Sequence, residues 1–475
     1  MLLGKSEYKK SIKGNDMKHH NFCKNDKLLR QRVKHLSASS IKTYNCVFDE
    51  IYELSGKTPT ELVKIGLKEQ DPYAEENGEK TFKYLPFRTI TEVHEDYEEY
   101  LEEKDMKDAT RKANLLAFRA LFNKHRIELP DMPTYHVKKP RTRSKDLPSD
   151  EDLALALELA NSPFEQLLFL TPRVTGFRLS DIAEFTYGFV LEATKLYHDG
   201  TLEDLLSKNP YEIIPRFEKD PVKTQSRGNL CITFATPEWT YYFFKYTNWR
   251  IRKYNEAIET LERLENDVRA RERRKTRMRK RIEKLKITPE APVFVSNTGR
   301  GGLGPNSLGR LFWEMNERIN KEKGIKGQEY EYKNEENNYG KFRSHNFRKV
   351  FSTVCRNNIF KLDIVTNDDM FRGLDVVSIF TGHTPPNMSN SEVYDAVEED
   401  SFDSDLRQIY TALVPYHTIH KEKYELEEEK RKRREAEEEA REIQENIENV
   451  VEERFKVVFD DWLEKKGLAG DGHES

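Results

Sequence analysis

Cysteine is scarce in this sequence, and long apolar runs are missing from it. The four cysteines, at positions 23, 46, 231 and 355, lie far apart and form no Cys-x-x-Cys pair. This spacing argues against a zinc site and against a disulfide framework, and it favours a reducing compartment such as the cytoplasm. No run approaches the roughly 18 apolar residues that cross a membrane, and the first residues lack the apolar core of a signal peptide. We therefore expect no membrane segment.

An excess of one charge is also lacking, because the net charge is only −4 although 35% of the residues are charged. The charges are nevertheless distributed unevenly. Residues 1–35 carry ten Lys or Arg against three Asp or Glu, whereas residues 421–475 carry twelve against nineteen. An acidic end thus masks a more basic body, so a weakly acidic balance does not exclude a nucleic-acid partner.

The length of 475 residues predicts two or three domains. Residues 1–35 are basic and poor in periodic apolar positions, and they are typical either of a disordered tail or of a DNA-contacting arm. Residues 36–132 contain apolar side chains at helical spacing after Ser37, after Thr91 and after Asp108, which predicts a small helical domain.

Residues 133–148 are basic and interrupted by prolines, as interdomain linkers are. Residues 149–415 are predicted to form a second domain. Alternating apolar residues near position 232 predict a strand there, behind a hairpin turn. Residues 249–286 predict a long helix or a helical hairpin inserted into this domain.

Residues 416–475 are predicted to form a charged helical tail, either with a coiled-coil seam or as a single solvated helix. The expected fold class is therefore mixed and mainly α: a helical domain, and an α+β domain with a small antiparallel sheet, a helical insertion and a long C-terminal helix.

Several short stretches that lie far apart share one chemistry. Arg178 follows Gly176 just before a helix for which Ser180 is the expected cap. Lys223 is predicted near the tip of the hairpin turn, and Lys219 is its rival. His345 and Arg348 are spaced i, i+3, so one face of a helix presents both.

Gly382 is expected to end a buried helix, and His383 follows it. Tyr394 lies beyond a polar loop with two prolines, and Tyr410 and Tyr416 are the fallback tyrosines. These guanidinium, ammonium, imidazole and phenol groups suit phosphoryl transfer to a tyrosine. No carboxylate cluster accompanies them, so the chemistry would need no metal.

In order and spacing, these motifs resemble the active-site boxes of the tyrosine recombinases, the phage-integrase family. The resemblance implies that residues 36–132 are a core-binding domain on double-stranded DNA and that residues 149–415 are the catalytic domain. It also implies that four protomers act on two paired duplexes and that accessory DNA-bending proteins are compatible partners. It leaves open whether the tyrosine acts in cis or in trans, and whether the reaction is integration, excision or resolution.

The resemblance further implies cleavage and rejoining of DNA through a 3′-phosphotyrosyl bond, without metal, cofactor or ATP. The implied catalytic residues are two phosphate-binding arginines, a general acid, a general base, a phosphate-contacting histidine and a nucleophile: Arg178, Arg348, Lys223, His345, His383 and Tyr394. A type IB topoisomerase-like enzyme, or a catalytically silent DNA-binding protein on the same fold, is the alternative.

Overall fold

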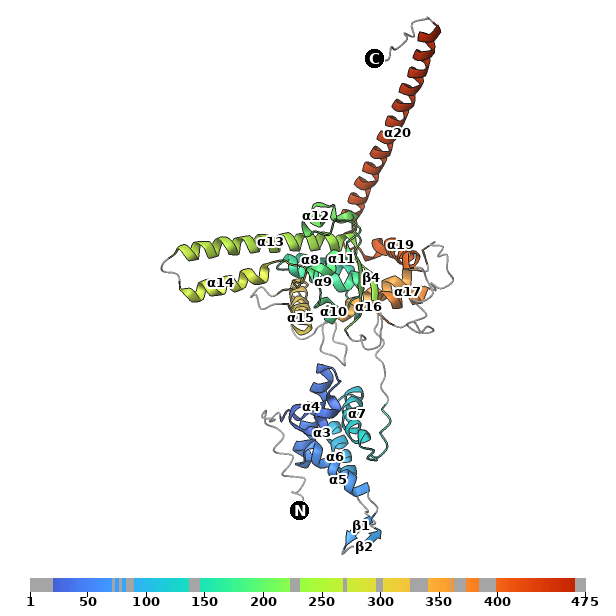
Figure 1. The fold of residues 1–475 in the computed structure, drawn as a ribbon. Coiled ribbons are helices and arrows are strands. Elements are labelled where there is room, and N and C mark those ends of the chain that lie inside the picture. The colour runs from blue at the N-terminus through green and yellow to red at the C-terminus, as the bar shows by residue number, and fades with distance from the viewer. Residues whose placement is uncertain are drawn as a thin grey trace, which may run out of the picture. The chain divides into compact units, whose positions relative to one another are not determined.

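The computed structural model describes residues 20–70, 73–76, 79–82, 89–135, 146–222, 231–267, 271–295, 302–324, 341–359, 361–362, 373–383 and 399–465. The chain divides into two compact units, Met1–Arg141 and Thr142–Ser475. Each unit has its own core of buried apolar side chains, as independently folding domains do. Helices dominate both units, and the expected mainly α class is confirmed (Figure 1).

The first unit consists of helices and one short β-hairpin: α2 (Phe22–Asn25), α3 (Lys27–Val33), α4 (Ala38–Ser55), α5 (Pro59–Gln70), β1 (Tyr73–Glu76), β2 (Glu79–Phe82), α6 (Thr89–Glu103) and α7 (Asp108–Lys124). Strands β1 and β2 pair antiparallel, with Tyr73 opposite Phe82. The side chain of Ser37 caps α4 by accepting from the N–H of Ser40, as its position in the sequence suggested.

The boundary expected at residue 35 falls inside this packed unit. Phe22, Leu29 and Val33 of α2 and α3 are buried in the same core as Phe48 and Phe118. Asp26 caps α3 and also accepts from the N–H of Thr60, which ties α3 to the start of α5. Residues 20–35 therefore belong to the helical unit rather than to a tail, because their few apolar side chains complete its core.

The second unit surrounds a two-stranded sheet with helices: α8 (Asp150–Glu158), α9 (Pro163–Thr175), α10 (Leu179–Ile182), α11 (Tyr187–Ala193), α12 (Leu202–Ser207), the 3-10 turn η2 (Pro210–Glu212), β3 (Arg216–Lys219), β4 (Cys231–Phe234), α13 (Pro237–Asn266), α14 (Glu272–Leu285), α15 (Pro305–Glu322), α16 (Ser344–Ile359), α17 (Gly373–Phe380), α19 (Glu399–His417) and α20 (Lys421–Lys465). Strands β3 and β4 pair antiparallel, with Lys219 opposite Cys231.

Helix α9 lies at the centre of the second unit. Every residue from Leu167 to Thr175 is buried, which is expected of a helix that is packed on all sides. Helices α13 and α16 both contact α9, and α16 also contacts α17 and α19. The C-terminal end of α9 is therefore held firmly, and this end leads directly into the Gly176–Arg178 turn.

A buried polar network attaches α19 to α9. The Nη1 atom of Arg173 lies 2.7 Å from Nδ1 of His417, and its Nη2 atom donates to Asp150 Oδ1 at 3.0 Å. Burial and the neighbouring Arg173 charge keep the pKa of His417 well below its ordinary value. A neutral His417 accepts at Nδ1 and carries its proton on Nε2, which lies 3.4 Å from Sγ of Cys355. The network thereby links α8, α9, α16 and α19.

The segment predicted at 249–286 is a helical hairpin. Its first helix, α13, begins at Pro237 inside the body, and α14 turns back beside it (Figure 1). The charged tail predicted after residue 416 contains the single long helix α20. None of the helices in the described part of the chain is both long enough and apolar enough to cross a membrane.

Candidate active site

Arg178 lies in a tight turn between α9 and α10. Gly176 caps α9 with φ of 68°, and a Cβ atom there would lie 2.5 Å from Cδ1 of Phe351, so both the conformation and the space require glycine. The N–H of Arg178 donates to Asp181 Oδ2 at 3.2 Å and so starts α10. Ser180, the expected cap, lies inside α10 instead.

Arg348 joins the ends of two helices. Its Nη1 atom donates to the carbonyl of Gly176, which caps α9, and its Nη2 atom donates to the carbonyl of Thr381, just after α17. The side chain is buried. Helix C-termini carry partial negative charge, which stabilises a cation in this position. Arg348 therefore holds the Arg178 turn and the His383 turn together.

The two guanidinium groups lie close enough to repel each other. Burial, together with the positive charge of Arg178, lowers the pKa of Arg348 to about 10, although Cys231 and Asp181 act in the opposite direction. The Nη1 atom of Arg178 is buried, and no residue in the described ranges accepts a hydrogen bond from it. Unpaired buried donors are costly, so this pair of arginines is suited to an anion.

His383 lies beside the same two arginines. Gly382 has φ of 59°, as the expected helix end requires, and a Cβ atom there would lie 2.7 Å from Cγ of Pro221. His383 as a whole is exposed, yet partial desolvation of its imidazole and the charges of Arg348 and Arg178 lower its pKa to about 4. The imidazole is therefore neutral at pH 7.

The hydrogen bonds of Thr381 assign the tautomer of His383. The Thr381 hydroxyl donates to the carbonyl of Val377 at 2.7 Å, and it also lies 2.7 Å from Nδ1 of His383. With the one hydroxyl proton assigned to the carbonyl of Val377, Nδ1 of His383 is the donor in the second contact. The Nε2 atom of neutral His383 then bears the lone pair. An anion placed beside the ring would raise its pKa, and a protonated ring donates from Nε2 as well.

The loop after β3 begins at this site. The N–H of Val222 donates to Asp181 Oδ1 at 2.9 Å, while Oδ2 of the same carboxylate holds Arg178. Lys219, at the end of β3, is paired with Glu184 at 2.7 Å. The rival lysine therefore already has a carboxylate partner, and the chain reaches Val222 next to the arginines.

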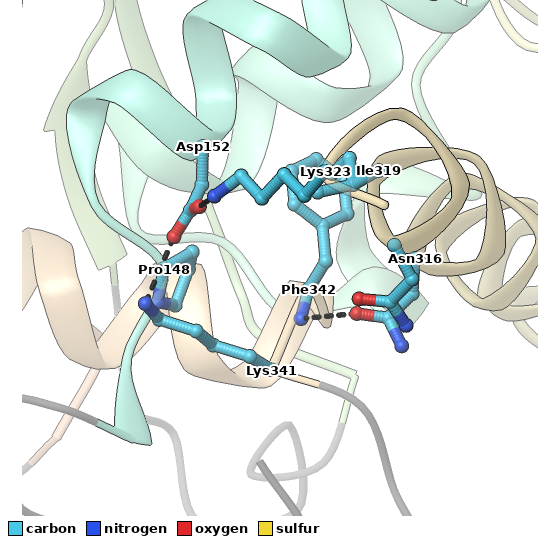
Figure 2. Close-up of a pocket in the computed structure, with 8 residues that line it drawn as sticks. Pro148, Asp152, Asn316, Ile319, Lys323, Lys341 and Phe342 are labelled. Carbon is cyan, nitrogen blue, oxygen red and sulfur yellow. Dashed lines mark hydrogen bonds and ion pairs between the residues drawn. The ribbon is translucent and has the colours of Figure 1, made fainter. Parts of the chain in front are cut away.

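His345 and Arg348 both lie on α16, at the predicted spacing. Arg348 is buried and His345 is exposed. Asp152 fixes the chain that leads into this helix, because its carboxylate binds Nζ of Lys341 at 2.9 Å and Nζ of Lys323 at 2.5 Å (Figure 2).

Burial opposes ionisation of Asp152, but its hydrogen bonds to the two ammonium groups and to the N–H of Ser149 lower its pKa to about 2. Asp152 is therefore charged at neutral pH. It joins Lys323, at the end of α15, to Lys341, three residues before α16, and so positions the start of α16.

Two predicted residues, Lys223 and Tyr394, lie outside the described residues. The fallback tyrosines differ from each other. Tyr410 is fully buried, and its hydroxyl donates to the carbonyl of Val174 at 2.6 Å. Tyr416 is 39% exposed. A phenol that must attack DNA needs access, so the burial of Tyr410 argues against it.

Sequence reasoning did not assign a positioning role to Asp181 or to Thr381. Asp181 bridges the Arg178 turn and the loop after β3, and Thr381 contacts both Arg348 and His383. Each lies within three residues of a predicted site residue. The local signal was the acidic residue at the third helical position after Arg178, where such residues accept backbone N–H groups.

The described residues therefore bring Arg178, Arg348 and His383 together, with the Lys219–Val222 segment beside them. The chain resembles solved tyrosine recombinases in structure. The XerA recombinase is 13% identical, with 80% of this chain and 95% of that chain covered and a TM-score of 0.27.

The integrase of transposon Tn1549 in complex with a circular intermediate DNA is 12% identical, with 80% and 98% covered and a TM-score of 0.39. The same integrase with transposon right end DNA is 13% identical, with 76% and 98% covered and a TM-score of 0.36. No protein-family model and no curated protein sequence matches the chain. Similarity at this level is too low to decide the function, which therefore rests on the site.

Proposed function

We propose that this protein is a site-specific DNA recombinase of the tyrosine recombinase family, which cuts and rejoins DNA through a 3′-phosphotyrosyl intermediate. One observation carries the proposal: Arg348 donates to the carbonyl of Gly176, two residues before Arg178, and a buried Nη1 atom of Arg178 has no acceptor among the described residues. A phosphodiester would supply that acceptor. Arginine suits it because the planar guanidinium binds phosphate oxygens and stays charged.

The proposed reaction uses the six residues that the sequence motifs supply. The phenol oxygen of Tyr394 attacks the phosphorus atom and forms the Tyr–O–P bond, while its proton passes to His345. The bond from phosphorus to the 5′-oxygen breaks, and Lys223 gives that oxygen a proton. Arg178, Arg348 and His383 bind the non-bridging oxygens, on which negative charge increases in the transition state. Reversal of these steps with another strand's 5′-hydroxyl rejoins the DNA without ATP.

Covalent capture tests the proposal. A nicked duplex that loses its short 5′-hydroxyl strand on cleavage cannot be religated, so the protein should remain attached to the 3′ end. We expect a protein–DNA adduct that survives SDS. After the DNA and the protein are digested, the modified peptide should carry the remaining nucleotide on Tyr394. Binding without any adduct would instead favour a catalytically silent DNA-binding protein. Relaxation of supercoiled DNA that has no specific site would favour a topoisomerase-like enzyme.

We further propose Lys223 as the general acid rather than Lys219. Val222, the residue before Lys223, is held by Asp181, whereas Lys219 is engaged by Glu184. Loss of a general acid typically lowers a rate by about 10²–10⁴-fold, so Lys223→Ala should lose that much cleavage on ordinary DNA.

A substrate with sulfur in place of the leaving 5′-oxygen provides the decisive comparison, because a thiolate leaves without being protonated. Lys223→Ala should cleave it at nearly the rate of the unchanged protein. Lys219→Ala serves as the matched control and should gain nothing from the sulfur. Rescue of Lys219→Ala in place of Lys223→Ala would reverse the assignment.

A further inference from the structure

Helix α14 carries a concentration of positive charge that its own hairpin leaves largely unneutralised. Its 14 residues include eight Lys or Arg and two Glu. Four of the basic residues, Arg273, Arg277, Lys280 and Lys284, follow one another at i, i+4, i+7 and i+11. This spacing places them on one face of the helix. We refer to these four residues as the α14 face.

Arg273, Arg277 and Lys280 of the α14 face are exposed, and Lys284 is partly buried at the end of the helix. Met278, Ile282 and Leu285, which are partly buried, lie on the opposite side of α14 at about 100° per residue. Ala257 and Leu264 are buried on α13, the helix that α14 contacts. The apolar side chains of α14 are therefore used within the hairpin, and the face left over is basic.

The two helices treat their charges differently. On α13, Arg252 and Lys253 pair with Glu256, and Arg263 pairs with Glu259. On α14, Arg279 pairs with Glu265 and Glu272, but no ion pair involves the α14 face in the part of the chain that the structure describes.

Like charges at i, i+3 and i, i+4 repel each other and destabilise a helix. The α14 face contains three such neighbours in sequence, so an external anion would relieve a repulsion that is built into the hairpin. A helix face that only contacts water does not require charges of one sign, and on α13 the basic residues are accompanied by acidic partners.

Arg250 fixes α14 to the body. It is fully buried, and its guanidinium donates to the carbonyls of Lys284, Leu285 and Lys286 at the end of α14 and to the carbonyl of Pro292. A cation at the C-terminus of a helix satisfies the last carbonyls. The basic face is thus presented on a support that is attached to the same unit as the candidate active site.

We infer that the α14 face is a second DNA-contact surface, which binds the phosphate backbone of duplex outside the cleaved segment. The inference rests on the proposed function, because that function brings duplex DNA to this unit. Arg273 and Lys284 are about 16 Å apart along the helix, and a duplex presents one phosphate per roughly 1.7 Å of its axis. Phosphates are therefore available to all four cations.

An acidic protein surface fits this face less well. Stable protein interfaces depend on aromatic or aliphatic side chains at their centre, whereas the non-basic residues interspersed on this side of α14 are Thr276 and Glu283. A face of cations without an apolar anchor is typical of backbone contacts, which position DNA without reading its sequence.

The test compares two triple variants of the full chain. Arg273→Gln with Arg277→Gln and Lys280→Gln removes three charges from the α14 face. Arg252→Gln with Lys253→Gln and Arg263→Gln removes three charges from α13 and is the matched control. Glutamine is a good helix former, and circular dichroism would check that both variants are folded. Fluorescence anisotropy would measure the Kd for 16- and 40-base-pair duplexes between 50 and 200 mM KCl.

Each phosphate contact contributes about 0.9 to the slope of log K against log salt, so the α14 variant should lose about 2.7 units of slope on the long duplex. Between 50 and 200 mM KCl, the Kd of the α14 variant should therefore rise by a factor roughly 40-fold smaller than the Kd of the unchanged protein does. The control should change the slope by less than one unit, and the short duplex should show a smaller difference between the proteins.

Equal effects of the two triple variants, or an unchanged slope in the α14 variant, would overturn the inference while leaving the proposed function intact. The inference would also be overturned if the α14 variant lost self-association but kept its DNA affinity. The α14 face would then bind an acidic segment of a second copy of the chain. Failure of the unchanged protein to bind any duplex would count against the proposed function itself.

Discussion

Tyr394→Phe is expected to abolish covalent capture on the nicked duplex while leaving DNA affinity unchanged. The substitution removes only the phenol oxygen, which is proposed to form the bond to phosphorus, and it retains the ring. The groups proposed to hold the phosphate, Arg178, Arg348 and His383, are left in place. The measurement is SDS-stable adduct per hour together with Kd from anisotropy on the same duplex.

Tyr416→Phe is the matched control, because Tyr416 is exposed and is the accessible alternative within the described residues. It should retain capture at the level of the unchanged protein. Tyr410→Phe should retain capture as well, with a loss of roughly 1–3 kcal/mol in the free energy of unfolding because the carbonyl of Val174 loses its donor. An adduct that persists in Tyr394→Phe and disappears in Tyr416→Phe would identify Tyr416 as the nucleophile instead.

The parts of the site that could be predicted from sequence are those set by local geometry. The helix end at Gly382, and the i, i+3 spacing of His345 and Arg348, depend on residues within one or two helical turns. Each of these features is found where the pattern placed it. Capping by Ser37 follows the same logic, because a cap involves neighbours in sequence.

The parts that could not be predicted depend on residues far apart in sequence. Arg348 spans the carbonyls of Gly176 and Thr381, and nothing near position 348 indicates either acceptor. Likewise, α2 and α3 hold so few apolar residues that their segment resembles a tail, and only the core contributed by α4 and α7 makes their burial favourable. The short β1–β2 hairpin was missed because alternation over four residues is too weak a signal.

The contacts of the two arginines predict different outcomes for their removal. Arg178→Ala should lower the cleavage rate by about 10²–10³-fold, the usual loss for a donor to the transition state. Its stability should be nearly unchanged, because Nη1 of Arg178 has no acceptor among the described residues and its charge opposes that of Arg348. Single-turnover cleavage and thermal unfolding measured on the same preparation would establish both.

Arg348→Ala should lose stability as well as cleavage. It leaves the buried carbonyls of Gly176 and Thr381 without their donor, and each unsatisfied group costs roughly 1–3 kcal/mol. A loss of about 2–6 kcal/mol is a large part of the roughly 5–15 kcal/mol that stabilises a typical domain. Arg348→Lys should recover part of the stability but not the two-pronged contact, since an ammonium group lacks the planar fork.

Arg318→Ala is the control for a purely structural loss. Arg318 is paired with Glu165 at 2.7 Å, so its removal should lower the free energy of unfolding while the cleavage rate at a permissive temperature stays unchanged. The role of Arg178 in the transition state would be contradicted if Arg178→Ala lost stability as Arg318→Ala does. It would also be contradicted if cleavage and DNA affinity fell in proportion. A cleavage defect in Arg178→Ala at unchanged Tm would instead separate the role of Arg178 in the transition state from the structural joint that Arg348 provides between α9 and α17.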